Sequence, residues 1–417
     1  KHIPLLYDCF WNHNLVWPSL CVRWGQVLEQ SQYLSWQHLF YSERGDQNAL
    51  VVAVAEVYNP RVCPPDGMAS FSEDRSSRHV TIQQKILIPG NKEVNRLREI
   101  RGNSLMVTKT DSASLYGWTI PGSKDKDASR DRNAKPTLTF TGHTGDANES
   151  NFALATCGSG KTGSVLSGDK TGKILMWHID DATSTLAGVD EETGATVIPC
   201  RETYLGHQGT VEDVCLNPSV PSSFASVGDD RLLCVWDARA GTTPRHSLSG
   251  VAPQDVHGVD WNAEADHLIL TGAGDGKIRL FDTRTMTSGA AVPVHIFENG
   301  HARAVFRVEW APHSTTHFSS AGEDTHLVVW DTSLIGTPAT QGPPELLFKH
   351  AGHRGQVADF HWNSASPWTM ASLSEDGDWA EGGGTLQMWR LSDLIYRPEA
   401  EVLAEVSQHY PVVTDAP

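Results

Sequence analysis

The sequence predicts an all-β fold built from repeated short sheets, and three observations support this prediction. Six strand-like runs end in an aromatic residue that is usually followed by an acid: Trp118, Trp177, Trp236, Phe281, Trp330 and Trp389. Their spacings of 59, 59, 45, 49 and 59 residues are typical of one four-stranded blade per repeat. A Gly-His pair precedes four of them, at Gly142-His143, Gly206-His207, Gly300-His301 and Gly352-His353. Recurring Gly-His and Trp-Asp pairs at this period predict a WD-repeat β-propeller.

The length of the chain indicates seven blades in one domain. A blade takes about 40–45 residues, so 417 residues accommodate seven blades with insertions. We expect an N-terminal helix and lead-in over residues 1–19, the propeller over 20–391, and a short C-terminal helix and tail over 392–417. The first helix is expected over 2–14. The second is expected to begin near Pro398, because proline suits the first turn of a helix.

The ends of the chain are expected to close the ring. The first blade is predicted within residues 33–58, where two strand-like runs flank a polar turn. Residues 20–25, LCVRWG, are a candidate strand that completes the last blade and so removes an exposed sheet edge. Three polar segments, 59–80, 121–136 and 180–200, are predicted to be solvated loops.

Polar residues keep a fixed distance from the last aromatic in the most regular repeats. A hydroxyl stands ten residues before it and an aspartate six residues before it: Ser226, Thr271 and Ser320, with Asp230, Asp275 and Asp324. Together with the histidine of the Gly-His pair, they could link strands and a turn by buried hydrogen bonds. We therefore predict a structural role for this set. The repeat ending at Trp177 departs from it, because Thr171 replaces the aspartate and Asp169 is displaced.

Composition narrows the classes of partner. The net charge of −17 disfavours nonspecific binding to DNA or anionic lipid and favours a Lys/Arg-rich protein segment. Seven scattered cysteines without a Cys-x-x-Cys pair predict neither a disulfide framework nor a zinc site. No apolar run approaches the roughly 20 residues of a membrane span. We expect no direct contact with nucleic acid or a membrane.

Two motifs that suggest chemistry do not hold up. Residues 155–162, ATCGSGKT, are one glycine short of a phosphate-binding loop, and a strand–turn–strand pattern follows where a helix is needed. His313 and His317 share a turn without further metal ligands in view. No nucleophile elbow and no His-Glu-x-x-His motif occurs. The sequence predicts no enzymatic activity, no cofactor and no metal.

Several segments outside the repeats resemble one family of WD proteins. They are LLYDCFWNHNLVWPSL (5–20), EVNRLRE (93–99), GHQGTVEDV (206–214), GPPELLFKHAGH (342–353) and TLQMWRLSDLIYRPE (385–399). These segments resemble the retinoblastoma-binding, MSI-type histone-binding WD-repeat proteins, and the two end segments are most similar to the plant FVE branch. The resemblance implies a nuclear, non-enzymatic adaptor that binds core histones. It also implies membership of histone deacetylase or Polycomb repressive complexes.

The resemblance implies a first histone surface on the acidic top of the propeller, which takes an extended basic tail. The matching positions are Glu93, Asn95, Phe152, Glu212, Asp229, His257, Phe306 and Glu375. Blade register adds Asp255 and Glu323. Several carboxylates around one opening would attract Arg and Lys and form charge-assisted hydrogen bonds. The alternative is that they are solvated turn acids of an acidic protein.

A second surface implied by the resemblance is a side groove for a histone-fold helix. Leu5, Leu6 and Phe348 could form its apolar wall, with Pro343 and Pro344 shaping the loop. The chain departs from the family here, because SLIGTPATQG before Pro343 lacks the usual acidic cluster, and a valine stands at position 16 where an acid is usual. In the alternative interpretation, the two leucines only pack the helix on the propeller.

Two other functions remain open from the sequence. Trp236-Asp237-Ala238-Arg239, and more weakly Phe281-Asp282-Thr283-Arg284, resembles the box by which WD proteins dock the adaptor of a cullin–RING ubiquitin ligase. Asp237 and Arg239 would be the docking residues of such a substrate receptor. The third interpretation is a scaffold whose acids serve only solubility.

Overall fold

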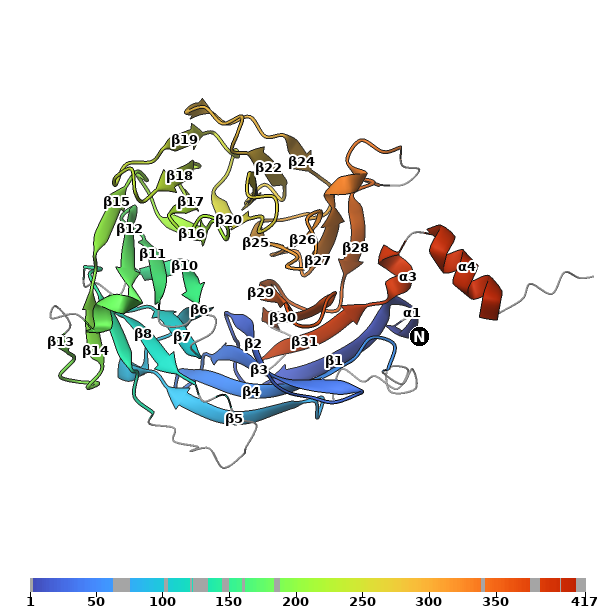
Figure 1. Cartoon of the computed structure of the whole chain (residues 1–417), viewed down its shortest axis with the longest axis horizontal. Helices are drawn as coiled ribbons and strands as arrows, with labels where there is room; N and C mark the ends of the chain where they lie inside the picture. The colour runs from blue at the N-terminus through green and yellow to red at the C-terminus, as the bar shows by residue number, and fades with distance from the viewer. Residues whose placement is uncertain are drawn as a thin grey trace, which may run out of the picture.

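The computed structural model is a ring of seven β-sheets around a central channel (Figure 1). It describes residues 3–62, 76–100, 104–120, 122, 134–144, 150–159, 162–183, 188–338, 342–375, 383–397 and 399–409. Each sheet contains four antiparallel strands in the order expected for a blade. The prediction of an all-β, seven-bladed WD-repeat propeller is confirmed.

The first four blades have the following strands, given from the channel outward. Blade 1 contains β2 (Val22–Gln30), β3 (Leu34–Glu43), β4 (Ala49–Tyr58) and β5 (Val80–Leu87). Blade 2 contains β6 (Val94–Ile100), β7 (Leu105–Thr110), β8 (Leu115–Thr119) and β9 (Leu138–Thr141). Blade 3 contains β10 (Ser150–Ser159), β11 (Thr162–Asp169), β12 (Lys173–His178) and β15 (Glu202–Leu205). Blade 4 contains β16 (Val211–Leu216), β17 (Ser223–Gly228), β18 (Leu233–Asp237) and β19 (His246–Ser249).

The remaining blades follow the same order. Blade 5 contains β20 (Val256–Trp261), β21 (Leu268–Ala273), β22 (Ile278–Asp282) and β24 (His295–Phe297). Blade 6 contains β25 (Val305–Trp310), β26 (His317–Gly322), β27 (Leu327–Asp331) and β28 (Leu346–His350). Blade 7 contains β29 (Val357–Trp362), β30 (Thr369–Glu375), β31 (Gly384–Leu391) and β1 (Tyr7–Leu15).

The ring closes differently from the prediction. The N-terminal strand β1 pairs antiparallel with β31, from Tyr7 opposite Leu391 to Leu15 opposite Gly384. Strand β2 is instead the innermost strand of blade 1. The expected helix over 2–14 and the expected closing strand over 20–25 are therefore wrong, and the helix α1 covers only Ile3–Leu6. The physical reason is that this segment buries Tyr7 and Phe10 against blade 7 while its backbone pairs the open sheet edge.

The segment 180–200, expected to be a loop, contributes two strands. Strand β14 (Thr196–Pro199) pairs parallel to β9, and β13 (Gly188–Val189) pairs with β14. Burial of Ile198 between blades 2 and 3 explains this ordering. A similar outer strand, β23 (Gly289–Ala290), pairs parallel to β19.

Few helices complete the fold. The 3₁₀ turns are η1 (Pro89–Asn91), η2 (Ile179–Thr183) and η3 (Thr332–Leu334). The C-terminal helices are α3 (Asp393–Tyr396) and α4 (Glu399–His409). Helix α4 begins one residue after the expected start at Pro398, which itself lies outside the described residues. Among the described helices, none is long and apolar enough to cross a membrane.

The predicted polar set is present in blades 4 and 6. In blade 4, His207 Nδ1 lies 3.0 Å from Asp230 Oδ2, its Nε2 lies 2.7 Å from Ser226 Oγ, and Trp236 Nε1 donates to the same hydroxyl at 2.8 Å. Burial alone would lower the pKa of His207, but the hydrogen bond to Asp230 raises it to about 9. In blade 6, His301 repeats these contacts with equivalent partners. The sequence prediction of a structural network is confirmed for these two blades.

Blades 3 and 5 depart from this set. In blade 3, Asp169 takes the aspartate role and lies 3.2 Å from His143, while Lys109 of blade 2 donates to Ser167 at 2.8 Å. In blade 5, Phe281 cannot donate, and the buried hydroxyl of Thr271 has no partner. The irregular repeats thus keep buried residues at these positions without the full network.

Candidate functional site

One end of the channel is defined by where the innermost strands begin, and we call it the upper rim. The second strand of each blade ends there, because it runs antiparallel to the first. The register places Val211 opposite Gly228, Val305 opposite Gly322 and Val357 opposite Ser374. Residues just before an innermost strand and just after a second strand therefore lie at the same end of the molecule.

All predicted top-face residues lie at this upper rim. Near the start of the innermost strands of blades 2 to 6 stand Asn95, Phe152, Glu212, His257 and Phe306. Directly before an innermost strand, or at the end of a second strand, stand Glu93, Asp229, Asp255, Glu323 and Glu375. The chain therefore brings acids and aromatics from separate blades to one opening, as the sequence predicted.

Four neighbouring blades present an alternating set of side chains at the upper rim. Glu212 Oε2 lies 3.9 Å from His257 Nδ1. The His257 ring meets the Phe306 ring edge-on, with centroids 5.8 Å apart. Phe152 is 38% exposed, and the Arg96 guanidinium lies 5.5 Å from its ring centroid. A cationic side chain placed here would meet a carboxylate and aromatic rings together.

The rim carboxylates differ in how they are paired. Glu93 forms an ion pair with Arg44, and Glu323 one with Arg303, both at 2.9 Å and both partly exposed. Glu375 accepts a hydrogen bond at 3.0 Å from the neutral amide of Gln356.

The carboxylate of Asp229 contrasts with these, because it is exposed and has no side-chain partner among the described residues. The two arginine partners of Glu93 and Glu323 were not foreseen from the sequence. Glu212, Asp229 and Glu375 are the rim acids best able to accept a cation from outside.

A buried group of charges lies deeper along the same innermost strands. Arg307 donates to Asp213 at 2.9 Å and to Asp359 at 3.1 Å, and Arg23 donates to Asp359 at 2.9 Å. Arg96 lies 3.8 Å from Asp359. We call these five residues the channel charge network.

The channel charge network joins several blades. Asp359 also accepts the backbone N–H of Val22 in blade 1, and Asp213 accepts that of Val259 in blade 5. Burial alone would raise the pKa of Asp359, but Arg23 and Arg307 hold it well below its usual range. Sequence reasoning missed this network, although charged residues inside the otherwise apolar strands VFRVEW and VADFHW could have indicated it.

The predicted side groove is only partly present. Leu5 and Leu6 of α1 are 64% and 39% exposed, and the two prolines at 343 and 344 are half-buried before β28. Phe348 is buried, with its ring edge-on to Tyr7 at 5.6 Å. It therefore belongs to the core of the ring rather than to an open groove wall, because strand β1 covers it.

The ligase-docking candidates lie at the end of β18. Arg239 Nε donates to Asp237 Oδ1 at 3.1 Å, and the arginine side chain is 72% exposed. Arg284 folds back on Asp282 in the same way at the end of β22. The two boxes thus have one geometry.

Other features of the described residues do not form a ligand site. Residues 155–159 belong to β10 and 162 begins β11, so a hairpin stands where a phosphate loop would need a helix. His313 packs against Trp362 and Trp368 rather than toward His317 as a co-ligand. No group of three or more His, Cys, Asp or Glu side chains in the described part of the chain could hold a metal ion.

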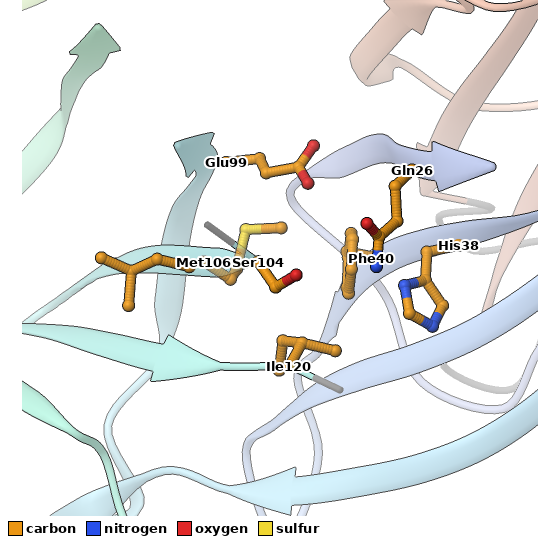
Figure 2. A pocket seen from close by; sticks show the side chains of 8 residues that line it. Gln26, His38, Phe40, Glu99, Ser104, Met106 and Ile120 are labelled. Carbon is orange, nitrogen blue, oxygen red and sulfur yellow. The ribbon is translucent and has the colours of Figure 1, made fainter. Parts of the chain in front are cut away.

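A crevice between blades 1 and 2 is also a packing gap. Figure 2 shows Gln26, His38 and Phe40 on one side and Glu99, Ser104, Met106 and Ile120 on the other. It has no room for a water molecule. Burial lowers the pKa of His38 to about 4, so this imidazole is neutral at physiological pH.

Comparison with known proteins agrees with this arrangement. Residues 1–59 match the family model of the histone-binding protein RBBP4, which also covers the corresponding component of the CAF1 complex. Residues 198–237, 242–282 and 291–331 match the model of the WD domain, G-beta repeat. The WD-40 repeat-containing protein MSI4 of Arabidopsis thaliana is 43% identical over 430 residues, which cover 97% of this chain and 83% of the relative. The WD-40 repeat-containing protein MSI3 of the same plant is 31% identical over 417 residues, covering 96% and 90%.

Proposed function

This chain belongs to the MSI-type, RBBP4-related family of histone-binding WD-repeat proteins, and we propose that it is a non-enzymatic adaptor that binds basic histone tails at the upper rim. The observation that carries the proposal is the convergence of acids from separate blades on one opening. Three of them, Glu212, Asp229 and Glu375, have no arginine or lysine partner among the described residues. The family assignment confirms the resemblance found in the sequence.

The geometry supports binding of an extended, cationic peptide. A lysine or arginine at the rim would gain charge-assisted hydrogen bonds from Glu212 and Asp229. Phe152 and Phe306 would contact its aliphatic stem or its charged head. The buried charges below are already paired with one another, so the rim acids remain available for the peptide.

The family also suggests where such an adaptor works. We place the chain in the nucleus, as a member of a histone deacetylase or Polycomb-type repressive complex. Co-purification from nuclear extract with partners identified by mass spectrometry tests this assignment. Recovery without histones and without members of either complex would leave only the scaffold interpretation, in which the acids serve solubility.

Titration with a basic histone-tail peptide tests the rim directly. The double variant Glu212→Ala with Asp229→Ala should bind at least about tenfold more weakly, since two charge-assisted contacts of about 1 kcal/mol or more each are lost. Affinity of the unchanged protein should also fall as salt rises, because exposed charges are screened within about 8–10 Å at physiological ionic strength. Unchanged affinity in a variant that remains folded would remove the proposal.

A second candidate function is substrate reception for a cullin–RING ubiquitin ligase. The exposed guanidinium of Arg239, held by Asp237 at the end of β18, favours it. Because this strand ends at the face opposite the upper rim, docking and histone binding would be compatible. Arg239→Ala should abolish capture of the ligase adaptor in a pull-down, and undiminished capture would discard this role.

A further inference from the structure

A second opening of the channel lies at the end opposite the upper rim. There the last residues of the innermost strands and the turns that follow them enclose a cavity of about 660 Å³, which we call the lower cavity. Its lining includes the turn residues Pro218, Ala263, Pro312 and Ser364. The volume lies in the range of about 300–1,000 Å³ that is typical of small-molecule sites.

One wall of the lower cavity carries a guanidinium without a counter-ion. Arg98 of β6 donates to the carbonyl oxygen of Leu97 at 2.9 Å. Among the described residues, no carboxylate lies within ion-pair distance of it. Burial, together with the positive charges of Arg23 and Arg307, holds the pKa of Arg98 well below its usual range. This wall would therefore gain from an anionic group.

The opposite wall carries carboxylates in the complementary situation. In the ring order, β20 and β25 lie across the channel from β6 (Figure 1). Asp260 of β20 accepts the backbone N–H of Trp310 at 2.7 Å, and Glu309 of β25 accepts that of Trp362 at 3.2 Å.

Neither carboxylate of this wall has an arginine or lysine partner among the described residues. The nearest basic group is His361, whose Nε2 lies 3.8 Å from Glu309. Burial raises the pKa of Asp260 to about 6 and that of Glu309 to about 7. This wall would therefore gain from a cationic group.

The two walls together define the class of ligand. The other charged residues of the lining, Arg23, Arg307 and Asp213, already belong to the channel charge network. A simple anion would satisfy Arg98 but face Asp260 and Glu309 unpaired, and a simple cation would do the reverse. We propose that the lower cavity binds a small zwitterion, with a carboxylate at Arg98 and an ammonium group at Asp260 and Glu309. Short peptides belong to this class and fit the volume.

Calorimetric titration with triglycine tests the proposal, with N-acetyl-triglycine and triglycine amide as blocked forms. Triglycine should bind with a Kd of about 1 mM or tighter. Each blocked peptide should bind at least about tenfold more weakly, because one wall loses its charged partner. Equal binding of all three peptides, or no binding of triglycine at such concentrations, would overturn the proposal.

Two variants locate the binding. Arg98→Met should abolish triglycine binding without lowering the Tm of the free protein, since no ion pair is lost. Glu309→Gln keeps the volume and should weaken binding at least about tenfold. It also serves as the test if Arg98→Met does not fold.

The control for both variants is Glu191→Gln, an exposed change in the turn after β13, which should leave the affinity for triglycine unchanged. Retained binding in both Arg98→Met and Glu309→Gln would contradict the assignment. The result is independent of the histone-tail titration, because none of these residues lies at the upper rim.

Discussion

The upper rim and the channel charge network are built from adjacent residues of the same strands, yet their charges have different roles. Glu212 is partly exposed and has only His257 near it, at 3.9 Å. Its neighbour Asp213 is almost fully buried and bonds Arg307 at 2.9 Å. Burial and pairing, rather than residue type, therefore separate the acids that can bind a partner from those that hold the blades together.

The expected energies of the two groups differ accordingly. An exposed ion pair contributes about 0–1 kcal/mol to stability. Breaking a buried pair by removing one partner costs about 3–5 kcal/mol, because the other charge is left without compensation. Substitutions at the rim should therefore change binding, and substitutions in the network should change folding.

The largest effect should follow from Asp359→Asn. The change keeps the volume but removes the charge that Arg23 and Arg307 share. We expect the free energy of unfolding to fall by about 3–5 kcal/mol, measured by urea denaturation. The matched change at the rim, Asp229→Asn, should alter it by no more than about 0.5 kcal/mol. Equal losses in the two variants would show that the two groups of acids do not differ in this way.

A second effect concerns Lys109, another buried charge that joins blade 2 to blade 3. Its ammonium group bonds Ser167 and the carbonyl oxygens of Ala153 and Gly168. Burial lowers its pKa from 10.5 to about 7. Between these two values the unfolded chain binds more protons than the folded one, so stability should rise with pH in this window.

Lys109→Met removes this dependence. Relative to the variant, the unchanged protein should gain about 2 kcal/mol of stability between pH 7 and pH 9. Urea denaturation of both proteins at several pH values provides the measurement. Parallel curves for the two would show that Lys109 does not titrate in the expected window.

The smallest effect should distinguish two acids of the rim. Glu93 is already paired with Arg44, whereas Glu375 accepts only from the neutral Gln356. Glu375→Gln should therefore weaken binding of a histone-tail peptide about threefold, and Glu93→Gln less than about twofold. The same titration measures both, and a larger loss for Glu93→Gln would reverse this ranking.

Much of the fold could be predicted from local pattern. The aromatic spacing indicated the blades, and the fixed offsets of Ser226 and Asp230 from Trp236 indicated the buried network of blade 4. The rim could be predicted too, since register along an antiparallel pair fixes which residues share one end. These features depend on periodicity, which a single sequence displays.

Long-range partners could not be predicted in this way. Strand β1 pairs with β31 across nearly the whole chain, and no local signal distinguishes it from a helix that buries the same Tyr7 and Phe10. The ion pair of Glu93 with Arg44 likewise joins two different blades. Phe348 was placed in a groove because the strand that covers it had been predicted as a helix.

The position of the rim acids, and not the total charge of the protein, should decide whether a basic tail binds. The most direct test compares two charge-matched variants in one titration with a histone-tail peptide. One carries Glu212→Gln and Asp229→Asn at the upper rim, and the other carries Glu191→Gln and Glu192→Gln, exposed in the turn after β13. We predict at least about tenfold weaker binding for the rim variant and less than about twofold for the other. Equal losses in both variants would contradict a role for the rim itself.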